Sequence, residues 1–440
     1  MHPTSIAVIG TGYVGLAAAA GLSYLGHNVT GVDVDEAQVA VLRDGGCPIY
    51  EPGLVEMLDS GRAAKLLRFT TNHRYAVEEA DAVFICVGSP TDAAGQADLS
   101  YVYEAIRQIA PTLSDGAAVV IKSTVPVGTT ANVRTLLQEL RPNLSIGIAA
   151  NPEFLRQGRA IHDFLHPDRI VVGTDEARVK ALIRGIYQPL LDADSSVVLL
   201  DTDIETAELV KYASNAFLAV KLSFINEIAD LCEQTGANIE DVAAGVGMDP
   251  RIGPAFLKAG PGFGGSCLPK DTQALLHTSR VHGAPSRLVA AAVDVNVERR
   301  RAMLYRVERA IGHSLTGATV AVLGITFKAG TDDLRDSPSV DIVRDLVGHG
   351  AAVRVTDPEG MERAAAILHG VEFFDDPYDA VSDADAVVVG TEWPEFAELD
   401  LGRIADTVES RVLVDLRNLI DPGAARDAGF EYHSIGRSRP

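Results

Sequence analysis

The chain has 440 residues, a formal net charge of −22, and a hydrophobic fraction of 47%. This length predicts two or three globular domains, and the acidic balance argues against nucleic acid or an anionic membrane surface as a partner. No stretch approaches the ~18 uncharged apolar residues of a membrane span, and the first residues lack a signal-peptide pattern. We therefore expect a cytoplasmic globular protein.

The first predicted unit is a strand, a glycine turn, a helix and a second strand. "SIAVI" is a short β-branched run, and Gly10, Gly12 and Gly15 follow at GxGxxG spacing before an alanine-rich helical stretch. The second strand ends in Asp33. In this dinucleotide-binding pattern the glycines let a pyrophosphate approach, and the acid binds the adenosine ribose. A carboxylate there would repel a 2′-phosphate, so we expect NAD rather than NADP.

Further strands are predicted to end in polar residues. "ADAVFICVGSPT" indicates a buried strand ending at a turn with Pro90, and "AAVVIKSTVPVGTT" indicates one ending near Thr124. "SIGIAAN" leads into a turn marked by Pro152, followed by Glu153. Because strand C-termini in such sheets face the ligand crevice, Thr124 and Glu153 are candidate site residues. Taken alone, Glu153 would be a surface acid by default.

Two long helical patterns occupy the middle of the chain. One runs from residue 203 to Gly236, and the other opens after Pro285 and ends at Gly312. On the first helix Lys211 and Asn215 are four residues apart and share a face. On this pattern alone, Lys211 is equally compatible with a surface position and with a functional role.

A second doubly wound unit starts near residue 318. "ATVAVLG", "GAAVRVTDPEG" and "ADAVVVGTEWPE" repeat the strand pattern of the first unit, but the turn lacks GxGxxG and carries the insertion "FKAGTDDLRDSPS". Its ligand is therefore predicted to differ from NAD. The expected fold class is α/β, with two doubly wound Rossmann-like domains joined by a central domain of long helices. We expect these domains at residues 1–200, 201–312 and 313–440.

The four cysteines, Cys47, Cys86, Cys232 and Cys267, are widely spaced and form no CxxC pair. Neither a disulfide framework nor a zinc site is expected from this usage. Cys86 and Cys232 fit a buried strand and a helix core, whereas Cys267 follows the glycine cluster of "GFGGSCLPKD" and has the best setting for chemistry. His162 and His166 could share a helix face as metal ligands, but no third ligand is apparent, so no metal is expected.

These motifs together resemble those of the UDP-glucose/GDP-mannose dehydrogenases. The resemblance covers nearly the whole chain, through "GTGYVGL", "PIYEPGL", "CVGSPT", "STVPVGTT", "NPEFLRQG", "AELVKYASNAFLAVKLSFINE", "RIGPAFLKAGPGFGGSCLPKD", "FKAGTDDLRDSPS" and "VDLRN". It implies oxidation of a nucleotide sugar's primary alcohol to a carboxylate, with two NAD per turnover. "NPEFL", "SNAFLAVK" and "DPRIGPAFLKAG" are similar to the branch that acts on UDP-glucose, with dTDP-glucose and GDP-mannose as alternatives.

The resemblance also implies catalytic roles. Cys267 would attack the sugar aldehyde, so that a second hydride can leave and a thioester remains for hydrolysis. Lys211 and Asn215 would stabilise the developing oxyanion, and Glu153 would activate the hydrolytic water. Asp271 and Thr124, with a bound water, would handle the alcohol proton, and Lys211 and Lys270 would favour the thiolate.

Binding positions carry over in the same way. Arg251 is implied to reach the sugar bound by the partner subunit, which predicts a homodimer built on the long helices. The implied cofactor contacts are Gly10, Gly12, Tyr13, Val14, Gly15, Asp33, Val87, Gly88, Ser89, Pro90, Ser123, Thr124, Gln157 and Arg335. The implied substrate contacts are Glu153, Phe154, Leu155, Lys211, Asn215, Arg251, Lys258, Gly262, Phe263, Gly264, Phe327, Lys328 and Arg417.

Two positions depart from the family's pattern. Gln157 stands where the family usually has glutamate, so cofactor placement or thioester hydrolysis could differ. Gln38 stands where a basic residue often helps to hold the ribose, which predicts a modest affinity for NAD. Two other functions stay open: a β-hydroxyacid dehydrogenase, which needs no cysteine, and an NAD-sugar sensor without catalysis. The intact set of catalytic positions argues against the sensor.

Overall fold

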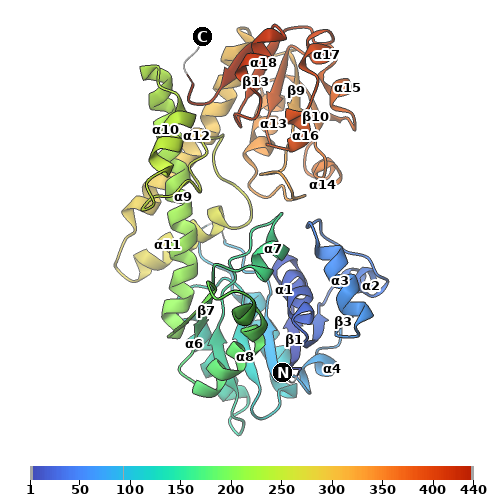
Figure 1. Cartoon of the computed structure of the whole chain (residues 1–440), viewed down its shortest axis with the longest axis vertical. Helices are drawn as coiled ribbons and strands as arrows, with labels where there is room; N and C mark the ends of the chain where they lie inside the picture. Colours follow the sequence, from blue (N-terminus) through green and yellow to red (C-terminus); the bar gives the residue numbers. More distant parts are fainter. Residues whose placement is uncertain (1–2, 93, 438–440) are drawn as a thin grey trace. The chain divides into compact units, whose positions relative to one another are not determined.

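The computed structural model describes residues 3–92 and 94–437, and the chain divides into two compact units (Figure 1). Unit 1 comprises Met1–Ser214 and Gln273–Ala284, and unit 2 comprises Asn215–Thr272 and Pro285–Pro440. This division into two units does not test the three domains expected at residues 1–200, 201–312 and 313–440, which remain a prediction.

Unit 1 is built on an eight-stranded sheet in the order β3-β2-β1-β4-β5-β6-β7-β8. The first six strands are parallel and have the Rossmann order, whereas β7 pairs antiparallel with β6 and parallel with β8. The strands are β1 (Ser5–Ile9), β2 (Asn28–Val32), β3 (Leu67–Thr70), β4 (Ala82–Ile85), β5 (Ala118–Ile121), β6 (Gly147–Ala150), β7 (Arg169–Gly173) and β8 (Val198–Thr202). The helices are α1 (Tyr13–Tyr24), α2 (Glu36–Arg43), α3 (Leu54–Ala63), α4 (His73–Val77), α5 (Ser100–Ile109), the 3-10 turn η1 (Ala110–Thr112), α6 (Thr129–Leu140), α7 (Ala160–Leu165) and α8 (Ala177–Ala193).

Small residues let α1 approach its neighbours closely. A Cβ added at Gly15 would lie 1.8 Å from the carbonyl oxygen of Gly10, and one at Gly21 would lie 2.3 Å from the ring of Phe164. The four alanines between these glycines are buried. The alanine-rich stretch therefore forms a helix that fits tightly between the sheet and α7, with its N-terminus directly after the glycine turn.

Unit 2 contains a six-stranded sheet in the order β11-β10-β9-β12-β13-β14, with every pair parallel. This order repeats that of the first six strands of unit 1, so the internal repeat predicted from sequence is confirmed. The strands are β9 (Thr319–Leu323), β10 (Ala352–Thr356), β11 (Val371–Phe373), β12 (Ala386–Val389), β13 (Val412–Asp415) and β14 (Glu431–Ser434). The helices after β9 are α13 (Pro338–Gly348), α14 (Met361–Ala365), α15 (Pro377–Val381), α16 (Pro394–Ala397), α17 (Leu401–Ala405) and α18 (Pro422–Asp427).

Between the two sheets in sequence lie α9 (Ile204–Thr235), α10 (Ile239–Gly247), α11 (Leu268–Val281) and α12 (Arg287–Ile311). The long helices α9 and α12 end where predicted, at Gly236 and Gly312, whose φ angles of 82° and 78° suit glycine. The α/β fold with two Rossmann-like sheets and a long-helix centre is thus confirmed. Within the described residues, none of the helices combines the length and apolar character that crossing a membrane requires.

Candidate active site

The glycine turn after β1 is shaped to receive phosphates. Gly10 has a φ of 91°, and a Cβ there would lie 3.0 Å from the backbone of Cys86. By contrast, a Cβ at Gly12 would meet no atom within 4 Å. The space beside Gly12, at the N-terminus of α1, is therefore open to a ligand, and the first N–H groups of a helix lack intrahelical partners. The turn fits the pyrophosphate of a dinucleotide.

Asp33 and Gln38 organise this turn from the second strand and α2. The Asp33 carboxylate accepts hydrogen bonds from the N–H (2.7 Å) and hydroxyl (3.1 Å) of Thr11, and its other oxygen accepts one from the N–H of Asp35 (3.1 Å). The Gln38 amide donates to the carbonyl oxygen of Thr11 (2.7 Å) and to its hydroxyl oxygen (2.9 Å). Gln38 thus stabilises the glycine turn by holding Thr11. The family pattern, in which a basic residue often stands at this position, did not suggest this role.

The ends of β4 and β5 hold each other through side chains. The Ser89 hydroxyl donates to the carbonyl oxygen of Thr124 (2.6 Å), and the Ser123 hydroxyl donates to that of Val87 (2.6 Å). These two crossed hydrogen bonds therefore lie among the predicted cofactor positions Val87, Gly88, Ser89, Pro90 and Ser123. The half-buried Thr124 follows β5 at the same end of the sheet as the turn after β1, with β4 between the two strands.

Glu153 and Lys211 form a buried ion pair. Lys211 Nζ lies 2.9 Å from Glu153 Oε1, and their side chains are only 5% and 4% exposed. The surface alternatives for both residues are therefore wrong. Burial alone would raise the pKa of Glu153, but the charge and hydrogen bond of Lys211, the N–H of Leu155 and the charge of Lys122 together hold it below its ordinary value. Glu153 is an ionised carboxylate at neutral pH.

Phe154, beside Glu153, has cations on its ring. The guanidinium of Arg169 lies 3.9 Å from the ring centroid and Lys211 Nζ lies 5.4 Å from it. Such stacking fixes the orientation of the ring and keeps two positive charges near the end of β6.

The segment with Gln157 is held by the "PIYEPGL" motif. Glu51 accepts hydrogen bonds from the N–H groups of Gly158 and Ala160, both at 2.7 Å, and from the hydroxyl of Tyr13. The half-buried Gln157 is therefore next to a fixed backbone position that also involves a predicted cofactor residue. Glu51 is a positioning residue that sequence reasoning missed, because Gly158 and Ala160, from whose N–H groups it accepts hydrogen bonds, are more than 100 residues away.

In unit 2 the glycines before Cys267 allow a close approach of two chain segments. A Cβ at Gly264 would lie 2.1 Å from the carbonyl oxygen of Asp336, and one at Gly265 would lie 2.6 Å from the ring of Phe327. The N–H of Gly265 donates to the carbonyl oxygen of Arg335 (3.0 Å). The glycine cluster thus packs directly against the insertion "FKAGTDDLRDSPS", which places Phe327 and Arg335 near Cys267.

Cys267 itself is half-buried and directly precedes α11. Negative charge is favoured at a helix N-terminus, which suits a nucleophilic sulfur. Arg335, predicted to contact NAD, lies close enough to interact electrostatically with the thiol. The pKa of Arg335 is raised, first by its hydrogen bonds to Asp333 and further by the charges of Asp333 and Cys267.

Asn215, Lys270 and Asp271 form a second polar cluster in unit 2. The amide of Asn215 donates to Asp271 Oδ2 at 2.6 Å, and Lys270 Nζ lies 2.5 Å from Asp271 Oδ1. Asp271 is fully buried and its N–H donates to the carbonyl oxygen of Cys267 (2.9 Å). Lys211 is one turn earlier than Asn215 on α9, just within unit 1.

Buried polar side chains on α9 and α12 hold the loop before Cys267. Asn226 accepts a hydrogen bond from the N–H of Gly260 (2.9 Å), and Arg299 donates to the carbonyl oxygen of Gly260 (3.0 Å). Asn296 accepts from the N–H of Phe263 (2.7 Å) and donates to its carbonyl oxygen (3.0 Å). These three were missed, although polar residues on otherwise apolar helix faces were a signal that could have identified them. They keep the predicted substrate segment 262–264 in one conformation.

The remaining substrate positions fall into a fixed set and an exposed set. Arg417 donates to the carbonyl oxygens of Gly390 (2.8 Å) and Phe327 (2.9 Å), and Lys328 Nζ lies 5.5 Å from the centroid of the Phe327 ring. Lys258 is exposed, and Arg251 is 88% exposed with an ion pair to Asp249. Phe327, Lys328 and Arg417 are therefore brought together, whereas Arg251 and Lys258 are not part of that group. Leu155 is half-buried beside Phe154.

The turn after β9 differs from its counterpart after β1. Asp357 occupies the position that Asp33 has in unit 1, and it accepts hydrogen bonds from the N–H groups of Ile325 (2.7 Å) and Thr326 (3.0 Å). Thr326 stands where unit 1 has Gly12; its side chain is buried, and its hydroxyl oxygen accepts a hydrogen bond from the indole N–H of Trp393 (3.0 Å). The space that is open beside Gly12 in unit 1 is therefore occupied by the chain's own side chains in unit 2.

The cysteines and histidines outside these clusters have structural surroundings. All four cysteines lie within the described ranges and none of them forms a disulfide, and Cys86 and Cys232 are buried as predicted. The rings of His162 and His166 lie 5.0 Å apart. In the part of the chain that is described, no group of three or more histidine, cysteine or acidic side chains is arranged to hold a metal.

Comparisons with known proteins identify the family of this chain. Profiles of the UDP-glucose/GDP-mannose dehydrogenase family match three regions: its NAD binding domain at residues 4–191, its central domain at 205–298 and its UDP binding domain at 321–422. A UDP-glucose 6-dehydrogenase of Rhizobium meliloti is 49% identical over 98% of this chain and 99% of its own length. One from Rickettsia felis is 43% identical over 98% and 96%. The structure of a UDP-glucose dehydrogenase from Pyrobaculum islandicum superposes with a TM-score of 0.91 at 38% identity, covering 99% of this chain and 98% of that one.

Proposed function

The chain belongs to the UDP-glucose/GDP-mannose dehydrogenase family, and on that premise we propose that it oxidises C6 of UDP-glucose to a carboxylate. The observation that carries this proposal is the position of Cys267 between the glycine cluster and α11, in the same unit as the Asn215–Asp271–Lys270 cluster. A dehydrogenase that stops at the aldehyde has no use for a thiol at this position. NAD, held at the turn of Gly10, Gly12 and Gly15, supplies the hydride acceptor for both oxidations.

In the first oxidation the alcohol loses a hydride and a proton to give the aldehyde. Asp271, with Thr124 and a water, receives the proton. Asp271 is suited to this because it is buried and its two carboxylate oxygens are held in place by hydrogen bonds from Asn215 and Lys270.

In the second oxidation the sulfur of Cys267 bonds to the aldehyde carbon, and the thiol proton goes to the carbonyl oxygen or to solvent. Lys211 and Asn215 stabilise negative charge on that oxygen. Loss of a second hydride and of the hydroxyl proton gives the thioester. Water then cleaves the C–S bond, which releases the carboxylate and restores the thiol.

Glu153 activates the hydrolytic water. In the unliganded chain its carboxylate is paired with Lys211, which also keeps it ionised and able to accept a proton. Lys211 therefore has to turn from Glu153 toward the substrate oxygen before Glu153 can act as a base. This exchange links oxyanion stabilisation to hydrolysis through one lysine.

We infer that the active enzyme is a homodimer and that it acts in the cytoplasm. Phe217, Phe224 and Leu231 recur every seven residues on α9 and are all exposed, as expected of a helix face that a second copy covers. The high exposure of Arg251 supports its reach toward the partner's sugar. Four cysteines without a disulfide among them fit a reducing compartment.

The decisive experiment measures NADH formed per sugar acid with UDP-glucose. The wild type should give two NADH for each UDP-glucuronate, and Cys267→Ser should lose steady-state acid production by several orders of magnitude, because a serine hydroxyl is a poor nucleophile without a dedicated base. Cys47→Ser, which makes the same change at a half-buried thiol in unit 1, is the matched control and should keep its activity. Near-normal acid production by Cys267→Ala would refute the mechanism. A higher kcat/KM for GDP-mannose or dTDP-glucose than for UDP-glucose would refute the substrate.

A further inference from the structure

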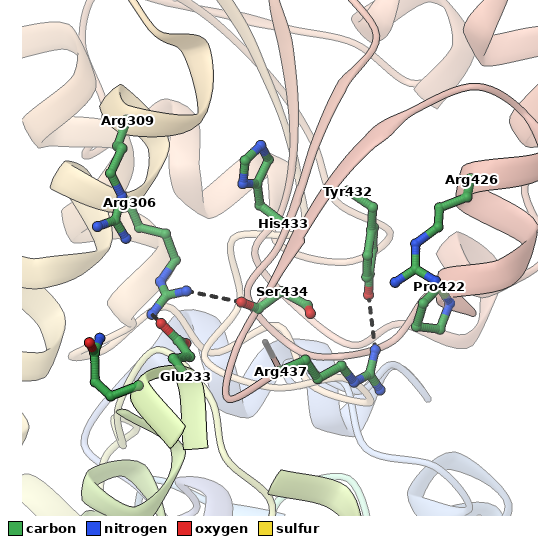
Figure 2. Close-up of a pocket in the computed structure, with 10 residues that line it drawn as sticks. Glu233, Arg306, Arg309, Pro422, Arg426, Tyr432, His433, Ser434 and Arg437 are labelled. Carbon is green, nitrogen blue, oxygen red and sulfur yellow. Dashed lines mark hydrogen bonds and ion pairs between the residues drawn. The ribbon is translucent and has the colours of Figure 1, made fainter. Parts of the chain in front are cut away.

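Unit 2 contains a cavity of about 260 Å³ that none of the steps above uses (Figure 2). Residues from the C-terminal parts of α9 and α12, from α18 and from β14 line it. Glu233, on its wall, follows Asn215 by 18 residues on the continuous helix α9. At 1.5 Å per residue the two are about 27 Å apart, so the cavity is separate from the cluster around Asp271.

The lining of this cavity is strongly basic. It includes Arg306, Arg309, Arg426 and Arg437 together with His433, whereas Glu233 is its only acidic member among the residues that the structure describes. The chain as a whole carries a net charge of −22 and so repels anions at long range. Four guanidinium groups around one cavity are therefore a local exception to the charge of the molecule.

Two of the arginines are fixed by the chain. Arg306 donates to both carboxylate oxygens of Glu233 (2.8 and 3.0 Å) and to the carbonyl oxygen of Ser434 (2.9 Å). Arg437 forms an ion pair with Glu240 at 2.7 Å. These contacts order the two side chains before any ligand arrives, which lowers the entropic cost of binding.

The other two arginines differ. Arg309 on α12 and Arg426 on α18 are exposed, and within residues 3–92 and 94–437 their side chains form no hydrogen bond or ion pair. In Figure 2 Arg309 and Arg306 lie on one side of His433, and Arg426 and Arg437 lie on the other. The cavity thus has a fixed and an unengaged guanidinium on each side.

We propose that this cavity binds an anion with phosphoryl groups, of the size of a diphosphate. A guanidinium donates two parallel hydrogen bonds to an oxyanion, and a tetrahedral phosphoryl group offers oxygens in several directions. Several arginines arranged around a centre can therefore share one phosphoryl group, whereas a planar carboxylate with two oxygens accommodates fewer. Arg309 and Arg426 would close on the ligand, and Arg306 and Arg437 would form its preordered base.

The test is a calorimetric titration of the full chain with inorganic pyrophosphate, in the presence of saturating UDP and NAD, which occupy the predicted substrate site and the glycine turn after β1. One pyrophosphate should bind per chain, and the affinity should fall with added sodium chloride. The double variant Arg309→Gln/Arg426→Gln should bind at least tenfold more weakly. The control Arg287→Gln/Arg301→Gln removes two exposed arginines of α12 outside the cavity lining and should stay within twofold of the wild type.

Three results would overturn the proposal: no heat of binding in the wild type, equal weakening in the control, or equally tight binding of citrate, which would remove the preference for phosphoryl groups. Near-unchanged UDP-glucose oxidation by the cavity variant is expected without pyrophosphate. It shows that the variant is folded and that the cavity is independent of the catalytic reaction.

Discussion

At the scale of single residues, Glu153 and Lys211 form an ion pair in unit 1 whose two side chains are 4% and 5% exposed. Two opposite charges that are almost completely buried stabilise each other, but each is costly once its partner is removed. The sequence placed Glu153 at a strand end and Lys211 on a helix face, yet it could not show that they meet. They are 58 residues apart, and only the packing of α9 against the sheet brings them together.

Removing the Glu153 carboxylate should therefore destabilise the fold. We expect Glu153→Gln to lower the free energy of unfolding by about 3–5 kcal/mol at pH 7, because it leaves the Lys211 charge buried without its partner. Urea unfolding measures this change. Glu139→Gln, at an exposed position of α6, is the control and should change the stability by no more than about 0.5 kcal/mol. A loss as small as that of the control would mean that the pair is not formed in solution.

The pair also predicts a pH dependence. The folded-state pKa of Glu153 lies below its unfolded value of about 4.3, so its contribution is fully present above that unfolded pKa. It is lost as the pH falls further, through the folded-state pKa. The stability difference between the wild type and Glu153→Gln should therefore be constant from pH 7 to about 5 and shrink at more acid pH. A difference that grows on acidification would contradict the lowered pKa.

At the scale of elements, patterns within a short stretch of sequence were the most informative. The ends of α9 and α12 and the repeated strand order were predictable because a glycine with a positive φ and a run of apolar residues are local signals. The reversed pair β7 and β8 was not predicted, since strand direction depends on a connection rather than on the strand's own residues. The bracing of Thr11 by Gln38 was missed for a similar reason: it joins elements 27 residues apart.

The glycine turn allows binding and folding to be tested separately. At Gly12 a Cβ meets nothing, so Gly12→Ala should keep its melting temperature while the KM for NAD rises by tenfold or more, because the methyl group occupies the space beside the helix N-terminus. At Gly15 a Cβ collides with the backbone of Gly10, so Gly15→Ala should lower the melting temperature. Thermal unfolding and NAD titration of both variants measure this. If Gly12→Ala binds NAD like the wild type, the turn is not the pyrophosphate site.

At the scale of the whole molecule, the family and the fold class were predictable because so many motifs occur in a fixed order. The contact between two copies of the chain is harder to predict than the family or the fold class. Its only signals are the exposed apolar side chains of Phe217, Phe224 and Leu231 on α9 and the exposed Arg251. The basic cavity of unit 2 was not predictable at all. Its four arginines come from three separate stretches of the chain, and none stands in a recognisable motif.

Mixing a variant with weakened substrate binding and an inactive variant tests the homodimer. If Arg251 acts on the partner's site, Arg251→Ala should raise the KM for UDP-glucose, and co-refolding it with an equal amount of Cys267→Ser should restore activity. Half of the dimers are then mixed, and each has one site with both residues intact, so roughly a quarter of wild-type activity is expected at low substrate. A mixture no more active than its components would show that Arg251 acts within its own chain, or not at all.

The contrast between the two glycine turns has a consequence for amide hydrogen exchange. Behind β9, the N–H groups of Ile325 and Thr326 are bonded to a buried carboxylate of the same unit. Their exchange should be slow whether or not NAD is added. After β1, the N–H of Thr11 is bonded to Asp33 in the same way and should also exchange slowly. The N–H groups of Gly12 and of the first residues of α1 should instead exchange rapidly until NAD arrives. The two turns would then differ at one position, where Gly12 in unit 1 corresponds to Thr326 in unit 2.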